Sequence, residues 1–308
     1  LAVELGAKHR KAYDQRLARE RQRILGLLEE DTAQSRFIAL KALTTLRQMA
    51  LDPALVDGGD GTEPGDAEGA AGADTDAAGG KAASGRKPDR RGARDAKSKA
   101  AAVPARGQRG PGRRPSPSAK VQVLLEHLGP ILSEGHRALI FSQFTRYLSG
   151  VREHLEAAGV RTAYLDGGTS NRQEVIDAFR AGGADVFLIS LKAGGFGLTL
   201  TEADYVFLLD PWWNPQAEEQ AVDRTHRIGQ DKPVMVYRLV SADTIEEKVM
   251  ALKEKKAELF ARVVEGTGDV EDGGEGAEGP SGTAGAAGTG GLSLAALTAA
   301  EIRELIED

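Results

Sequence analysis

Two arginines three residues apart, Arg224 and Arg227, are the side chains of this sequence best suited to phosphate chemistry. Residues 216–226 contain no proline or glycine and are expected to form a helix, so the two arginines lie about one turn apart on a common face. A guanidinium group stays charged and its planar fork matches phosphate oxygens, so the pair could clamp one phosphate group. A solvated basic face is the alternative for an isolated pair of this kind.

The elements that must position this pair alternate between strand and helix. Helical patterns occur near 119–133, 145–158, 170–181 and 215–227, and apolar, β-rich runs separate them. This alternation predicts an α/β domain with a mainly parallel sheet, and the continuous apolar runs favour strands that are covered on both faces. The expected strands are Ala138–Ser142, Thr162–Leu165, Val186–Ser190, Tyr205–Leu209 and Val234–Val240.

Polar residues stand where these strands end, namely Ser142, Asp166, Ser190 and Asp210. Ligands of parallel α/β sheets bind beyond the carboxyl ends of the strands, so these residues fall on the functional edge. Ser142 with the following Gln143 could simply cap the strand.

Two further features lie in the predicted loops. Gly194-Gly195-Phe196-Gly197 follows a strand but lacks the Gly-Lys-Ser/Thr of a P-loop, so a tight turn and a phosphate-approaching loop are both open. Trp212 and Trp213, the only tryptophans, lie in a proline-bounded loop where half-buried packing and ligand contact are both open.

The stretch Gln220-Ala-Val-Asp-Arg-Thr-His-Arg-Ile-Gly-Gln230, with Trp213-Asn-Pro just upstream, resembles helicase motif VI of the Swi/Snf-related superfamily 2 DNA-dependent ATPases. Residues 138–145 are similar to motif IV, 164–172 to the segment after it, and 190–200 to motif V. Residues 8–51, with Ala42-Leu-Thr-Thr-Leu-Arg-Gln-Met49, resemble the helical region that precedes this lobe in the family.

The resemblance implies a RecA-like, P-loop-NTPase-type lobe with N-terminal helices and a C-terminal brace helix, acting on double-stranded DNA. It makes Arg224 and Arg227 catalytic arginine fingers, and Trp213 the tryptophan that packs near or enters the DNA groove. Thr199 stands where the family usually has asparagine. Implied DNA contacts are Ser142, Gln143, Ser190, Lys192, Ala193, Gly194 and Trp213, and implied nucleotide contacts are Gly197, Thr199, Gln220, Arg224 and Arg227.

The first lobe of such an enzyme is missing from this sequence. No Gly-x-x-x-x-Gly-Lys-Ser/Thr and no Asp-Glu-x-His occurs, so the phosphate cradle, the magnesium-holding carboxylate and the water-activating acid are absent. The expected cofactor is ATP with Mg²⁺, whose magnesium is held mainly by the first lobe of the same protein, and we expect this chain alone not to hydrolyse ATP. Because the chain begins at Leu1 within a helical pattern, we expect a fragment or the C-terminal part of a longer protein.

Composition agrees with an intracellular DNA-associated protein. There is no cysteine, the five histidines form no metal-ligand cluster, and no apolar run is long enough for a membrane span, so neither metal site nor membrane association is expected. The expected location is the cytoplasmic nucleoid if the source is bacterial and the nucleus if it is eukaryotic.

Charge is segregated along the chain although the net charge is only −6. Residues 57–80 carry seven acids and no base, whereas 81–114 carry twelve Lys/Arg against two acids. This Gly/Ala/Pro-rich tract has too little apolar surface to fold and is expected to be disordered. Its basic half could contact DNA loosely or serve only as a solubilising insertion.

The resulting domain organisation has six parts. Residues 243–262 repeat apolar side chains at helical spacing, which predicts an amphipathic helix that either packs on its own lobe or braces the other one. The expected parts are a helical region 1–56, a disordered linker 57–117, a RecA-like lobe 118–242, a brace helix 243–265, a Gly/Ala-rich linker 266–291 and a C-terminal helix 292–308.

Two other functions fit the same residues. One is an RNA-directed superfamily 2 helicase or an RNA-polymerase-recycling ATPase, against which the Trp-Asn-Pro and Arg-Ile-Gly-Gln residues argue. The other is a non-catalytic module that binds DNA or docks a partner through residues 243–308. Comparing ATPase stimulation by duplex DNA, single strands and RNA separates the enzymes, and Walker residues upstream in the intact gene would exclude the module.

The linker prediction can be tested by proteolysis. We expect trypsin to cut first at sites such as Arg90, Arg91, Arg113 and Arg114, because exposed flexible tips are preferred cleavage sites, while the lobe from about 118 to 264 survives. Limited digestion with mass spectrometry locates the cuts. Slow amide exchange throughout 57–117 would instead reveal an ordered insertion.

Overall fold

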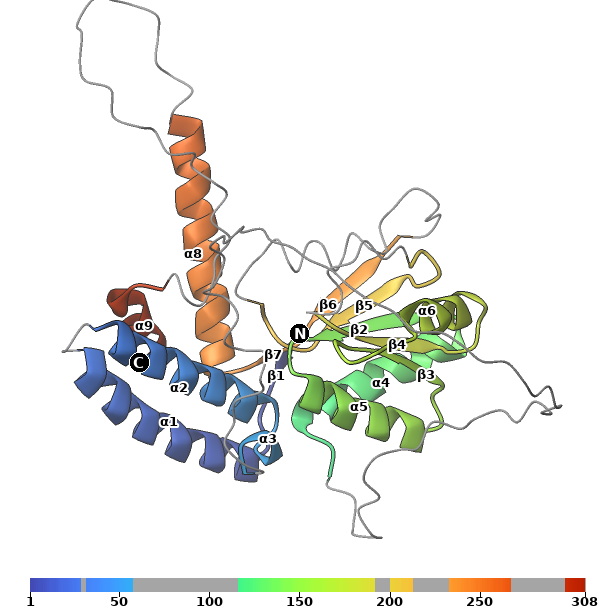
Figure 1. Ribbon diagram of the computed structural model, residues 1–308, viewed down its shortest axis with the longest axis horizontal. Helices are drawn as coiled ribbons and strands as arrows, with labels where there is room; N and C mark the ends of the chain where they lie inside the picture. Colours follow the sequence, from blue (N-terminus) through green and yellow to red (C-terminus); the bar gives the residue numbers. More distant parts are fainter. Residues whose placement is uncertain (29–31, 58–115, 192–199, 213–232, 267–296, 308) are drawn as a thin grey trace, which may run out of the picture. The chain divides into compact units, whose positions relative to one another are not determined.

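The central sheet of the α/β lobe has five parallel strands in the order β3-β4-β2-β5-β6 (Figure 1). The computed structural model describes residues 1–28, 32–57, 116–191, 200–212, 233–266 and 297–307. The chain runs from the central strand to β3 and β4 on one side and then crosses to β5 and β6 on the other. The strands are β2 (Ala138–Ser142), β3 (Thr162–Leu165), β4 (Val186–Ser190), β5 (Tyr205–Leu208) and β6 (Met235–Arg238).

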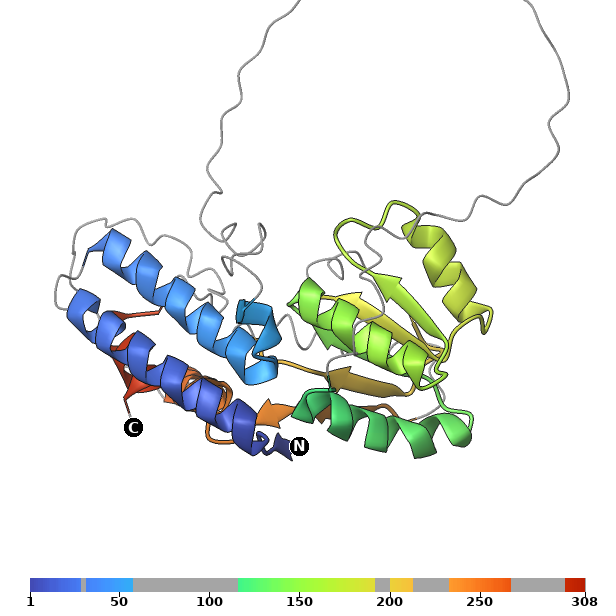
Figure 2. The same cartoon turned by 90° about the horizontal axis from the view of Figure 1, so that it is seen from below.

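Both faces of this sheet are buried. Side chains alternate along β2, so that Ala138 and Ile140 pack with α4 (Ala119–Ser133) and α5 (Thr145–Ala157), while Leu139 and Phe141 pack with α6 (Arg172–Arg180). Figures 1 and 2 show α4 and α5 together on one side of the sheet and α6 on the other. The predicted fold class, a parallel sheet flanked by helices, is confirmed.

Three expected strands have the expected bounds, and the other two have different bounds. β5 stops one residue early, at Leu208. The expected strand Val234–Val240 is divided into β6 and a short β7 (Val240–Ser241). The Leu239 N–H still donates to the Leu208 carbonyl at 2.9 Å, and after Leu239 the chain no longer pairs with β5. β7 then pairs in parallel with β1 (Ala2–Val3). The expectation that the chain begins inside a helix is therefore wrong: its first residues form a strand because a partner far along the sequence is available.

A group of helices forms a second core. The long helices α1 (Ala7–Leu28) and α2 (Ala33–Leu51) lie side by side (Figure 2), and the short α3 (Ala54–Asp57) follows. The Thr32 hydroxyl accepts the N–H of Ser35 at 3.1 Å, a capping interaction that begins α2. Helices α8 (Ile245–Gly266) and α9 (Ala299–Ile306) contribute to the same core. Its buried members include Ile24, Leu43, Leu46, Ile245, Val249, Leu252, Ile302, Leu305 and Ile306.

Helix α8 covers most of the stretch expected to be amphipathic, and its buried Val249 packs with its own chain. Bracing of a second lobe stays a prediction. Residues 58–115 and 267–291 of the two expected linkers, together with the expected helix 215–227, lie outside the described residues. Among the helices of the described ranges, none is both long and apolar enough to cross a membrane.

The helix–sheet packing gives a stability prediction. Leu124 of α4 is fully buried against the sheet, so Leu124→Ala should lower the free energy of unfolding by about 2–5 kcal/mol through lost burial and the cavity that remains. Glu126→Ala, an exposed position on the same helix, is the control and should change it by less than about 0.5 kcal/mol. Urea unfolding measures both, and equal effects would contradict the packing described.

Candidate nucleic-acid and nucleotide interface

The strand register brings two of the predicted site residues, Ser142 and Ser190, to one edge of the sheet. Ser142 ends β2 directly beside Ser190 at the end of β4, and Phe141 pairs with Leu208 of β5, two residues before Asp210. The loops that follow these strands therefore start side by side, at the edge where parallel α/β sheets bind ligands.

Asp210 organises the loop after β2. The backbone N–H of Gln143 donates to both carboxylate oxygens, at 3.3 and 3.4 Å, and the Ser142 hydroxyl also bonds this carboxylate. The Ser142 Oγ in turn accepts the N–H of Phe144 at 3.1 Å. Asp210 is 2% exposed, so it holds this turn from inside the protein. Burial raises its pKa, against the lowering effects of Arg47, Ser142 and Lys120.

Arg47 of α2 reaches this carboxylate from the helical group. Its Nη2 lies 3.8 Å from an Asp210 carboxylate oxygen and donates to the Pro211 carbonyl, and its Nη1 donates to Gln143 Oε1 at 3.3 Å. The guanidinium also lies over the Phe144 ring at 5.6 Å. One side chain thus contacts the segments that follow two different strands.

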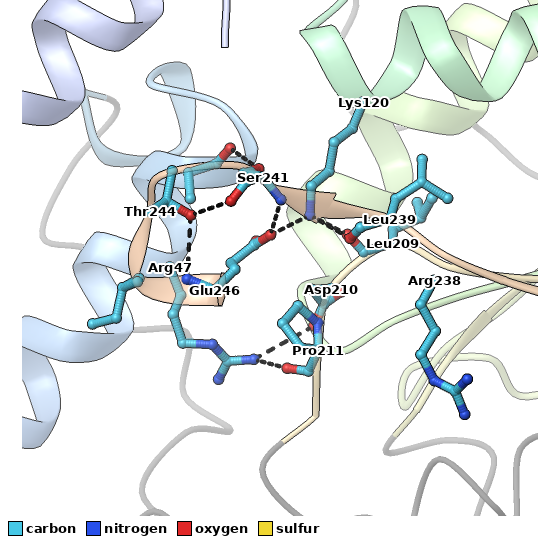
Figure 3. Close-up of polar contacts among 12 residues, drawn as sticks. Arg47, Lys120, Leu209, Asp210, Pro211, Arg238, Leu239, Ser241, Thr244 and Glu246 are labelled. Carbon is cyan, nitrogen blue, oxygen red and sulfur yellow. Dashed lines mark hydrogen bonds and ion pairs between the residues drawn. The ribbon is translucent and has the colours of Figure 1, made fainter. Parts of the chain in front are cut away.

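Lys120, in the first turn of α4, is the second buried cation (Figure 3). Its Nζ donates to the carbonyls of Leu209 and Leu239, at 2.7 and 2.9 Å, and to Glu246 Oε2 at 2.5 Å. The three donors of an ammonium group are therefore all used. Burial lowers the pKa of Lys120, and the adjacent Glu246 carboxylate opposes that shift.

Glu246 connects the ammonium to the start of α8. Its Oε2 also accepts the Ser241 N–H at 2.9 Å, and the hydroxyl of Thr244 accepts the N–H of Glu246 at 3.2 Å. The buried Tyr13 hydroxyl accepts the N–H of Ile245 at 2.7 Å. The first N–H groups of α8, which lack partners within the helix, are thus satisfied by α1 and by the preceding turn.

The predicted site residues fall into two groups. Ser142 and Ser190 are buried, whereas Gln143 is partly exposed; no partner among the described residues reaches Gln143 Nε2 or Ser190 Oγ. Trp212 is partly buried. The remaining predicted contacts lie outside the described residues: Lys192, Ala193, Gly194, Gly197, Thr199, Trp213, Gln220, Arg224 and Arg227. Within the described ranges, no cluster of three or more metal-ligating side chains occurs.

Sequence reasoning missed Arg47, Lys120 and Glu246. A signal existed for two of them, since Arg47 interrupts an apolar helix face and Lys120 precedes the apolar face of α4. Such positions are common on surfaces, however, and only the fold shows that these three side chains are buried.

Solved structures with the same fold support the assignment of a RecA-like fold. The crystal structure of the C-terminal part of the Fun30 ATPase domain superposes with a TM-score of 0.57 at 23% identity, covering 82% of this chain and 87% of that one. The Sulfolobus solfataricus SWI2/SNF2 ATPase core in complex with dsDNA gives 0.57 and 23%, covering 87% of this chain and 46% of that one. The α/β part of the chain therefore has the fold of a RecA-like lobe.

Sequence comparisons agree with the motifs. Residues 119–229 match the Helicase conserved C-terminal domain, and this match, together with relatives of the SNF2 family, supports a C-terminal lobe of a Snf2-type helicase.

The relatives are much longer than the matched stretch. The SNF2 domain-containing protein ENL1 of Oryza sativa subsp. japonica is 42% identical over 151 residues, which is 48% of this chain and 15% of that protein. The human SWI/SNF-related matrix-associated actin-dependent regulator of chromatin subfamily A member 1 is 42% identical over 154 residues, 49% and 15% of the two chains. The ATP-dependent helicase rhp16 of Schizosaccharomyces pombe is 40% identical over 153 residues, 48% and 18%.

The buried ion pair gives a third prediction. Lys120→Met should lower the free energy of unfolding by about 3–5 kcal/mol, because it leaves Glu246 buried without its counter-ion. The double variant Lys120→Met/Glu246→Met should lose less than the sum of the two single variants, since both charges are then removed. A urea-unfolding double-mutant cycle measures the coupling, and additive losses would show that the pair does not act as a unit.

Proposed function

We propose that this chain is the second motor lobe of an ATP-dependent double-stranded DNA translocase, and that it works only with a first lobe of the same protein. The main support for this proposal is the match of residues 119–229 to a helicase C-terminal domain. The matched range contains both Arg224 and Arg227. Relatives named as SNF2-domain and SWI/SNF-related proteins support the proposal, as does a solved neighbour described as a complex with dsDNA.

In this proposal Arg224 and Arg227 are the arginine fingers of the composite ATPase site, together with nucleotide contacts from Gly197, Thr199 and Gln220. Bound ATP supplies the phosphoryl group that is hydrolysed, and its magnesium is held mainly by the first lobe. The fork of each arginine matches the equatorial oxygens on which negative charge spreads during transfer. This chain therefore stabilises the transition state but does not activate the water.

The proposed DNA track follows the carboxyl edge of the sheet. It consists of the loops that contain Ser142, Gln143, Ser190, Lys192, Ala193, Gly194 and Trp213. Gln143 is the partly exposed member among the described residues, and its Nε2, which is buried and has no hydrogen-bond partner there, is the donor proposed for a phosphate. Ser142 is buried and its Oγ accepts the N–H of Phe144, so in this conformation it acts by holding the backbone of the loop.

The relatives also bear on location. They carry the names of eukaryotic chromatin and helicase proteins, from rice, human and fission yeast. They support a nuclear location and give no support to a bacterial nucleoid.

The arginine assignment is tested in the intact two-lobe protein. Arg227→Ala should lower the DNA-stimulated kcat by on the order of 10³ or more, with a much smaller change in DNA affinity. Arg227→Lys should not restore it, because a point charge lacks the fork. Arg161→Ala, an exposed position at the opposite edge of the sheet, is the control. Near-normal turnover by Arg227→Ala would refute the assignment.

The DNA assignment predicts binding through the backbone and not through the bases. Affinity of the intact protein for duplex DNA should be nearly independent of sequence, and log K should fall linearly with log salt, by about 0.9 per phosphate neutralised. Fluorescence anisotropy with duplexes of different sequence, at several salt concentrations, measures both. A strong preference for one sequence at fixed salt, or stimulation of the ATPase by RNA alone, contradicts the proposal.

A further inference from the structure

Arg47 comes from outside the α/β lobe, yet its guanidinium lies at the edge that carries the proposed DNA track. It belongs to α2 in the helical group and is 2% exposed. Its partners are Gln143 after β2 and Asp210 and Pro211 after β5. The next residues along the chain after Pro211 are the two tryptophans, which lead to the arginine segment.

The chemistry of these contacts requires an arginine. The acceptors are a side-chain amide oxygen, a backbone carbonyl and a carboxylate, and they belong to two separate loops. A planar guanidinium presents several donors in fixed directions, so it can join acceptors on both loops at once. A lysine ammonium at the end of a flexible stem does not impose the same spacing.

Attachment of α2 to the lobe does not by itself explain this arrangement. Burying charged groups is costly, and well-packed apolar side chains often stabilise a contact equally well. Leu51 of the same helix already packs in the apolar core that α4 and α5 form with the sheet. The charged contact instead fixes a geometry, because Asp210 simultaneously holds the backbone of Gln143.

We propose that Arg47 is a positioning residue of the motor, which sets the loop after β2 and the segment after β5 relative to each other. This inference rests on the proposed function. It gives the helical pair α1–α2 a part in the response of the motor to DNA. The neighbouring Lys120 extends the arrangement, because its ammonium joins the Leu209 carbonyl, next to Asp210, to Glu246 in the first turn of α8 (Figure 3). Helices α2 and α8 are thereby both tied to the strand-end segment.

The first test uses this 308-residue chain and needs no ATPase activity. Trp212 and Trp213 are its only tryptophans and directly follow Pro211, so intrinsic fluorescence reports on the segment that Arg47 holds. Arg47→Lys and Asp210→Asn should shift the emission maximum and change acrylamide quenching of the folded protein. Two variants are used so that the result does not depend on one of them folding.

Arg137→Lys is the matched control for lost arginine contacts. Arg137 also donates to two backbone carbonyls, those of Phe179 and Ala184, and lies over the Phe179 ring, but it precedes β2 at the amino-terminal edge of the sheet. Its variant should lower Tm without altering tryptophan emission. If the Arg47 and Asp210 variants likewise change only Tm, Arg47 is a structural anchor and the proposal is overturned.

The second test uses the intact two-lobe protein. Arg47→Lys should raise the DNA concentration for half-maximal ATPase stimulation by about 2- to 30-fold, the range of couplings typical for residues between sites, whereas Arg137→Lys should leave it unchanged. An unchanged DNA response in Arg47→Lys would overturn the proposed link to the motor. Absence of DNA-stimulated ATPase in the unaltered protein would refute the proposed function itself, and the fluorescence test would still decide whether Arg47 positions the segment.

Discussion

Burial of the Lys120 ammonium constrains this structure more than any other single interaction of the described residues. A charged group away from water must have its hydrogen bonds supplied by the protein, and here two carbonyls at the ends of strands and one carboxylate supply them. Leu209, Leu239 and Glu246 must therefore converge on one point. That requirement joins the start of α4, the carboxyl ends of two neighbouring strands and the first turn of α8.

The second buried cation applies the same constraint to the loops. Arg47 and Lys120 are balanced by Asp210 and Glu246, so the interior holds two positive and two negative side chains close together. The apolar sheet supplies the low dielectric in which such contacts are strong and directional. Because a parallel sheet covered on both faces leaves its strand ends as the place for polar groups, the charges and the proposed DNA track share one edge.

The sheet itself could be predicted from the sequence because its signal is local. The runs Ala138–Ser142 and Val186–Ser190 are continuously apolar and β-rich, which is what strands buried on both faces require. Their expected bounds coincide with the structure. The run at 234–240 is also apolar and β-rich, but it divides at Leu239, because β7 pairs with the N-terminal Ala2–Val3 more than two hundred residues away in sequence. No local pattern encodes that pairing.

By itself the sequence determined the parallel α/β lobe, the polar edge at Ser142, Ser190 and Asp210, and the resemblance that points to Arg224 and Arg227. Periodicity and motif spacing carry that information, since they depend on residues that are near each other along the chain. Only the tertiary structure decided that Arg47, Lys120 and Glu246 are buried partners of this edge. These three residues are separated by 73 to 199 positions, so the sequence does not show that they are partners. Burial of a charged residue without a partner costs too much free energy, so such a residue is assigned to the interior only when its partner is known.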